Sequence, residues 1–317
     1  MTMQQPGIRP ASLLPSGEQF ALHLGDQRAV VSEVGATLRS YTVAGRELLD
    51  TFAADQMSSS GRGQVLLPWP NRIDGGRYTF DGQTYQLPLT EPDAGNAIHG
   101  LTRWLNWVPV DQTPTRVALG LLLHPQVGYP FLLALEIAYT LTAAGLEARA
   151  TAHNVGAAPL PFGAGQHPYF TLGVAPVDEL RLTLPAATYL LTNDRGIPTG
   201  RAPVAGTGLD FRAQRPIGPA ALDTCFADLA ADADGFVRVH LAHPSGAPRL
   251  TLALDPAYAY VQVFTGDTIG DPAARRRGVA VEPMTCAPDA FNSGDGLRVL
   301  APGETFTVHW QVSVAEA

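Results

Sequence analysis

The chain has 317 residues, of which 45% are hydrophobic and only 16% charged, so it can bury a large core. Its net charge of −8 and the lack of a dense basic stripe argue against a nucleic-acid partner, because phosphate binding needs clustered cations. All 21 basic residues are arginine, which excludes chemistry that needs a lysine amino group, such as a Schiff base or a pyridoxal phosphate anchor.

Residues 1–17 are rich in Pro, Ser and Gln and predict a loose N-terminal leader. They contain no apolar run long enough for a signal peptide, and no stretch of the chain reaches the length of a membrane span. We therefore expect a soluble, cytoplasmic protein without a membrane partner.

Short segments of alternating polar and apolar residues begin at residue 18. Alternation with β-branched and aromatic residues, broken by Gly and Pro, is the signature of strands. A short helix is expected at residues 219–230 (PAALDTCFADLA). In chain order, the expected strands cover residues 18–24, 28–34, 36–43, 77–80, 84–89, 116–124, 131–142, 146–154, 237–243, 249–255, 258–266 and 305–314.

The organisation of the chain predicts one antiparallel all-β domain of sandwich type over residues 18–317. No shift in composition marks a linker, and no repeat of fixed period is present. Cys225 and Cys286 match no metal spacing and predict two free, partly buried thiols, although spacing alone leaves a disulfide between them open.

The first polar residue that departs from the β pattern is His167, in GQHPYF. In a strand, His167 and Tyr169 face one side, while Gln166 and Phe170 face the other. Pro168 removes a ladder hydrogen bond and favours an edge or bulged strand. His167 is thus held where strand pairing stops, either as a proton carrier or as a core histidine.

A carboxylate stands in a similar context in GVAVEPMT, where Glu282 follows an apolar run and precedes a proline. If Glu282 is buried, desolvation raises its pKa toward that of a useful base. If it lies at a strand end, it is simply hydrated. The local sequence favours neither interpretation.

Other polar candidates lie in loops. In PWPNRIDGG, Arg72 could bind ligand oxygens or form a structural ion pair, and Trp69 could stack on a sugar or pack in the core. His99 precedes a glycine turn in NAIHG, and Asp223 in LDTCF could cap a helix. The run Arg275-Arg276-Arg277 is typical of a solvated loop, with a phosphate site as the less favoured reading.

Seven segments, taken in order, resemble the aldose 1-epimerase (galactose mutarotase) family. They are NRIDGGRYTFDGQTYQL, NAIHG, HPYF, LDTCF, YVQVFTGD, VEPMTCAPDAFN and LAPGETFTVHWQVSV, and the similarity extends from about residue 18 over the rest of the chain. The chain departs from the better-known mutarotases in the residues after Glu282 and in the compact arginine-rich loop GDTIGDPAARRRG. Both departures put the preferred sugar in doubt.

The resemblance implies a β-supersandwich fold and interconversion of the α and β anomers of a free aldohexose, with no cofactor and no metal. By position, His167 matches the family's general acid and Glu282 its general base. A histidine near its ordinary pKa of about 6.5, raised by a nearby carboxylate, would suit the acid role. The positions that match sugar contacts are Arg72, His99 and Asp223 and, with less support, Asn71 and Gln262.

Other functions stay open at this point. A hexose-phosphate mutarotase or epimerase would use the arginine run, and a non-catalytic sugar-binding protein could keep the fold without the activity. A polysaccharide lyase or glycoside hydrolase would usually need a longer chain or a retaining pair of carboxylates. Partners other than a small monosaccharide are not expected, and the oligomeric state is not predicted.

Overall fold

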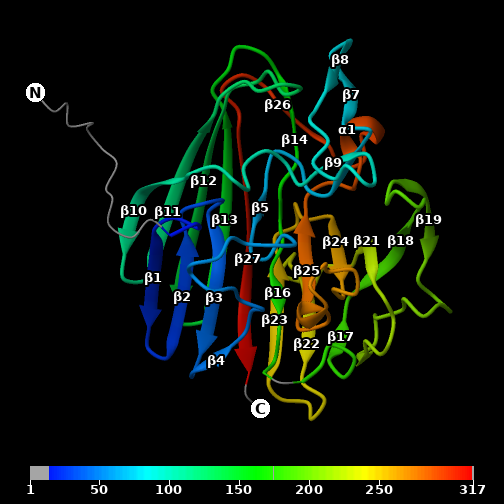
Figure 1. The fold of residues 1–317 in the computed structure, drawn as a ribbon. Coiled ribbons are helices and arrows are strands. Elements are labelled where there is room, and N and C mark those ends of the chain that lie inside the picture. The colour runs from blue at the N-terminus through cyan, green and yellow to red at the C-terminus, as the bar shows by residue number, and fades with distance from the viewer. Residues whose placement is uncertain (1–13, 174, 316–317) are drawn as a thin grey trace, which may run out of the picture.

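The computed structural model describes residues 14–173 and 175–315, and strands in antiparallel sheets make up nearly all of the regular secondary structure in this part of the chain (Figure 1). Residues 1–13 of the expected leader lie outside the described residues. Residues 14–17 form a turn in which the Gly17 N–H donates to the Leu14 carbonyl.

A nine-stranded antiparallel sheet extends through the whole fold. The long C-terminal strand lies at its centre and pairs with β13 on one side and β23 on the other (Figure 1). Its order is β10 (Val108–Thr113), β11 (Arg116–Leu123), β12 (Leu133–Thr142), β13 (Gly145–Asn154), β27 (Thr305–Ala315), β23 (Arg249–Leu254), β22 (Val237–Ala242), β17 (Arg181–Thr183) and β20 (Arg215–Pro216).

A four-stranded sheet packs on one half of this sheet, where β1 and β2 contact β11 and β12. Alternate residues of its strands, such as Phe20, Leu22 and Val31, are buried between the layers. The hydrophobic positions of the alternating segments therefore form the core. The strands are β1 (Gln19–Leu24), β2 (Gln27–Ser32), β3 (Thr37–Val43) and β4 (Arg46–Glu47).

An eight-stranded sheet contributes to the same core beside β22 and β23. Val261 and Val281 pack in one cluster with Leu241 and Leu252, so the residues next to them in sequence point to the opposite face of this sheet. That face carries the candidate site. The strands are β19 (Pro198–Pro203), β18 (Ala186–Thr192), β21 (Asp223–Leu229), β24 (Tyr260–Phe264), β25 (Val279–Met284), β15 (Gly165–Gln166), β5 (Val65–Leu66) and, on β25, β16 (Tyr169–Phe170).

Short elements complete the fold, and several of them gather at one end of the molecule near β7, β8 and α1 (Figure 1). They comprise three two-stranded pairs, a 3₁₀ helix and one turn of α-helix. Their bounds are β6 (Arg72–Asp74) with β9 (Asn96–Ile98), β7 (Arg77–Phe80) with β8 (Gln83–Gln86), β14 (Leu160–Phe162) with β26 (Arg298–Leu300), η1 (Pro272–Ala274) and α1 (Ala290–Ser293).

The antiparallel all-β class is confirmed, and every expected strand overlaps an observed one. The helix expected at residues 219–230 is wrong. These residues contain β21, which pairs with β18 and β24, so pairing with two neighbours overrides the helix propensity of Ala and Leu. Cys225 and Cys286 are buried free thiols, as expected. In the described part of the chain, no helix is long and apolar enough to span a membrane.

Candidate active site

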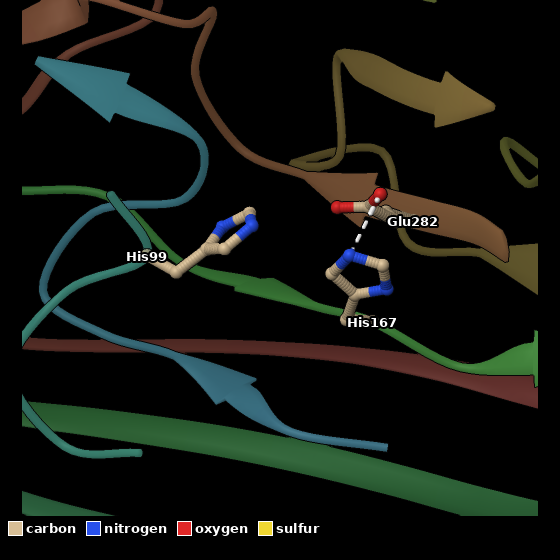
Figure 2. A group of neighbouring side chains, drawn as sticks. All are labelled: His99, His167 and Glu282. Carbon is tan, nitrogen blue, oxygen red and sulfur yellow. Dashed lines mark ion pairs between the residues drawn. The ribbon is translucent and has the colours of Figure 1, made fainter. Parts of the chain in front are cut away.

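His167 and Glu282 meet because a sheet ladder is interrupted between them. Gly165 pairs with Met284 and Tyr169 with Ala280, so His167 lies opposite Glu282. Both residues precede a proline, which has no N–H to give to the ladder. Opposite residues project from the same face of a sheet, and His167 Nε2 lies 3.2 Å from Glu282 Oε1 (Figure 2).

The pair is almost completely removed from solvent, with His167 5% and Glu282 2% exposed. Burial raises the pKa of Glu282 well above its ordinary value, with a further contribution from Asp223. Burial also lowers the pKa of His167 to about 3, assisted by the Arg103 guanidinium. The expectation that the carboxylate would raise the pKa of His167 is therefore wrong, because desolvation dominates. Around neutral pH the pair holds one proton between its two groups.

Several polar atoms at this site have no hydrogen-bond partner among the described residues. They include Glu282 Oε2, His167 Nδ1 and Gln262 Oε1, all buried. A buried polar atom left unpaired costs about 1–3 kcal/mol. Glu282 Oε2 in particular is a free acceptor at the wall of a cavity, where the hydroxyl group of a ligand would satisfy it.

The side chain of His99 is fixed by Asn71. The backbone N–H of Asn71 donates to His99 Nδ1 at 3.1 Å, and the Asn71 carbonyl accepts from the His99 N–H. Burial lowers the pKa of His99 well below its ordinary value, so the ring is neutral. Since Nδ1 accepts, the proton is on Nε2, and His99 offers an N–H donor.

The backbone of both residues is strained. Asn71 has φ of 54° and His99 has φ of 63°, in the left-handed region that non-glycine residues seldom occupy. Both flank the short β6–β9 ribbon, in which Arg72 pairs with Ile98. Strain of this kind persists only where the surrounding structure enforces it, and it clusters at functional sites.

Arg72, Asp223 and Gln262 form a polar network beside the pair. Arg72 donates two hydrogen bonds to Glu91, at 2.8 and 2.9 Å, and its Nη2 lies 3.8 Å from Asp223 Oδ2. Gln262 Nε2 donates to Asp223 Oδ1 at 2.5 Å. Gln262 is the sheet partner of Glu282, so the two side chains share one face. Asp223 is a strand residue and caps no helix.

These residues line a cavity of about 300 Å³, which is at the small end of the range for ligand sites. Six of the seven residues expected from the sequence line its walls, and the seventh, Gln262, donates a hydrogen bond to the wall residue Asp223. The volume and the polar lining suit one small hydroxyl-rich ligand. The lining residues with polar side chains are Ser60, Asn71, Arg72, Thr90, Glu91, His99, Arg103, His167, Tyr169, Asp223, Thr268 and Glu282.

Sequence reasoning missed Arg103 and Glu91. Arg103 lines the cavity, its Nη2 donates to the Ile98 carbonyl, and none of the described carboxylates pairs with it. Burial lowers its pKa to about 10. Both residues stand in polar loop segments, TEPDAGN and LTRWLN, that carry no motif of their own. Only their position in space identifies them.

The arginine run Arg275–Arg277 does not line the cavity, and other groups of the protein hold its side chains. Arg275 donates to the Ile269 carbonyl, Arg276 pairs with Asp178 and Asp267, and Arg277 pairs with Asp50. These partners leave the interpretation of the run as a phosphate site without support. The interpretation of Trp69 as a core residue is confirmed, since the residue is 2% exposed and its ring packs on Phe291.

A metal ion is a second kind of ligand to consider here. Ligand atoms of His99, His167 and Glu282 lie within 4.8 Å of one another (Figure 2). Coordination through His99 Nε2 would require that nitrogen to lose its proton, whereas the Asn71 N–H already occupies Nδ1. The donor set therefore fits hydroxyl groups better than a metal.

Comparisons with known proteins cover most of the chain. The family model described as aldose 1-epimerase matches residues 20–313. The chain is 36% identical to a protein of Escherichia coli K12 named YihR, which is uncharacterized, over 97% of this chain and 96% of the relative. It is 29% identical to the aldose 1-epimerase of the same organism, over 75% of each.

Solved structures share the fold. The GalM/aldose epimerase homologue of C. elegans superposes with a TM-score of 0.85 at 18% identity, over 95% of this chain and 99% of the other. The architecture described above is therefore a galactose mutarotase-like β-supersandwich. Together with the match over residues 20–313, these findings establish that the chain belongs to the aldose 1-epimerase family.

Proposed function

We propose that the protein is an aldose 1-epimerase, an isomerase that interconverts the α and β anomers of a free aldohexose of the glucose or galactose type. The observation that carries this proposal is the buried His167–Glu282 pair, 3.2 Å apart at the wall of a cavity of about 300 Å³. A protein that only binds sugar has no need of an acid and a base in contact.

The reaction needs a proton removed from the hydroxyl O1 and a proton added to the ring oxygen O5. Both oxygens are bonded to C1, so a pair of adjacent groups can reach both of them. Glu282 takes the O1 proton as His167 gives its proton to O5, which breaks the C1–O5 bond and leaves an aldehyde. Rotation about C1–C2 and closure with the proton transfers reversed give the other anomer.

The pair keeps one proton throughout this sequence. In the open-chain state the proton is on Glu282 and His167 is neutral, which is the distribution that burial favours in the site. The environment thus stabilises the form of the pair that accompanies the intermediate. General acid and base catalysis of this kind contributes about 10²- to 10⁴-fold for each group.

The remaining cavity residues orient the sugar. The His99 Nε2–H is a donor, Asp223 is an acceptor with a half-exposed side chain, and Arg72 is held in place by Glu91. Donors and acceptors at fixed positions hold the ring so that O1 and O5 lie against the pair. No step in this scheme calls on a cofactor.

Exchange spectroscopy of the anomeric protons tests the proposal at equilibrium. Wild-type protein added to D-glucose or D-galactose should produce exchange between the α and β signals that is absent without protein. Binding of either sugar without enhanced exchange would indicate a sugar-binding protein and would refute the enzyme.

A hexose phosphate is the second candidate substrate, and Arg103 is the observation that favours it. Arg103 is a partly buried cation without a carboxylate partner among the described residues, and it acts on the pKa of His167. In the proposed reaction His167 gives its proton to O5. The carbon that bears C6 is bonded to O5, so a group on C6 would lie near His167 and therefore near Arg103. Glucose 6-phosphate should then exceed glucose in kcat/KM for wild type but not for Arg103→Gln. Equal ratios in both proteins would exclude this substrate.

A further inference from the structure

The imidazole of His167 is not oriented by a hydrogen bond in the usual way. Its Nε2 faces Glu282, while its Nδ1 is buried without a partner among the described residues. A catalytic histidine usually has its second nitrogen held by a carboxylate or a carbonyl, which sets the plane of the ring. Another device must therefore hold this ring.

Three neighbours restrict the ring directly. The phenol ring of Tyr169 stacks on it, with centroids 4.9 Å apart and planes 11° from parallel. Gly61 lies against it so closely that a Cβ there would be 2.5 Å from His167 Cδ2. The His99 ring adds an edge contact, with centroids 5.3 Å apart. A rotation of the imidazole would break these contacts.

Tyr169 is itself held on several sides. Its hydroxyl donates to the Ser60 carbonyl at 2.8 Å, and its backbone carbonyl accepts from the Asp50 N–H. The Arg62 guanidinium lies 5.1 Å from the ring centroid and is bonded to the buried Asp50. Ser60 and Gly61 are neighbours in sequence, so a single loop anchors the phenol and contacts the imidazole.

From this arrangement we infer that Tyr169 and Gly61 are positioning residues, which fix the plane of His167 and so aim Nε2 at the reacting oxygens. The inference rests on the proposed function and extends it. Tyr169 acts through its ring, so the stacked face matters more than its hydroxyl. Gly61 acts by having no side chain.

The ring of Tyr169 is tested by comparing Tyr169→Phe with Tyr169→Leu. Misplacement of a reacting group by about 1 Å can cost 10²-fold in rate. Tyr169→Leu should therefore lower kcat by about 10²-fold with little change in KM, whereas Tyr169→Phe should stay within about threefold of wild type. Tyr258→Leu is the control, because Tyr258 is equally buried and does not line the cavity.

A folded Tyr169→Leu protein with wild-type kcat would overturn the inference, as would an equal loss of kcat in Tyr258→Leu. Gly61→Ala supplies an independent variant, matched by Gly303→Ala. Gly61 has φ of +80° and Gly303 of +78°, but a Cβ at Gly303 meets nothing within 4 Å. Loss of kcat in Gly61→Ala alone supports the inference, and equal loss in both variants overturns it.

Histidine NMR tests the positioning role of Tyr169 independently of the proposed function. Stacking on an aromatic ring shifts the imidazole protons of His167, whose signals are assigned by their loss in His167→Gln. Tyr169→Leu should move these signals in the absence of sugar, and Tyr169→Phe should not. If wild type lacks mutarotation the proposed function fails, whereas unmoved signals in Tyr169→Leu defeat the positioning role.

Discussion

Replacing His167 by Gln changes how the stability of the protein depends on pH. In the folded protein, burial lowers the pKa of His167 to about 3, whereas an unfolded histidine titrates near 6.5. Between these values the unfolded state binds the extra proton, so this residue destabilises wild type progressively as the pH falls below 6.5. The destabilisation is absent at higher pH, where His167 is neutral in both states.

The size of the effect follows from linkage. Each pH unit below 6.5 contributes about 1.4 kcal/mol, so the two units down to pH 4.5 amount to about 3 kcal/mol. Glu282 is buried in both proteins, and its raised pKa changes the free energy of unfolding with pH in the same direction in each. The difference between the proteins therefore reports on His167.

Urea unfolding of wild type and His167→Gln at several values between about pH 7.5 and 4.5 measures this difference. The free energy of unfolding of His167→Gln minus that of wild type should rise by about 3 kcal/mol as the pH falls. A difference that does not change with pH, or that falls, would refute the reasoning. It would mean that His167 is already an imidazolium paired with ionised Glu282 in the folded protein.

Two further measurements test the protonation state of the pair and the role of Arg72. The pair binds a second proton, on His167, only near pH 3, so kcat/KM should not fall between about pH 6.5 and 4.5. A loss of kcat/KM centred near about pH 6.5 would contradict a pair that holds one proton. Glu91→Gln removes the two bonds that hold Arg72, so KM for galactose should rise about tenfold, or about 1.4 kcal/mol, with a smaller change in kcat. The control is Glu136→Gln, since Glu136 is a half-exposed carboxylate next to Arg116. Equal KM in both variants would exclude Arg72 from sugar binding.

Much of the fold follows from the sequence because many of its strands alternate between buried and more exposed residues. In residues 131–142 every second side chain is buried, and in residues 305–314 every second side chain is buried in the core or packs against it, so the period of two was readable without the structure. The helix expected around Asp223 failed because short Ala- and Leu-rich segments carry no clear period. Pairing with β18 and β24, which decides their conformation, involves residues far away in the chain.

The candidate site, too, could be predicted from the sequence only in part. The shared face of His167 and Tyr169 was predicted from alternation and is confirmed by the stacking of their rings. The meeting of His167 with Glu282 depends on the register of β25, which no local pattern reveals. The lowered pKa of His167 depends on burial and on Arg103, a residue that has no sequence signal at all.

Polarimetry with freshly dissolved α-D-galactose and α-D-glucose is the most direct test of the central claim, that His167 and Glu282 catalyse mutarotation. Wild type should speed the decay of rotation, and Glu282→Gln, which keeps the shape of the side chain, should lose at least about 10²-fold of that acceleration. No acceleration by folded wild type with either sugar, or equal acceleration by Glu282→Gln, would contradict the claim.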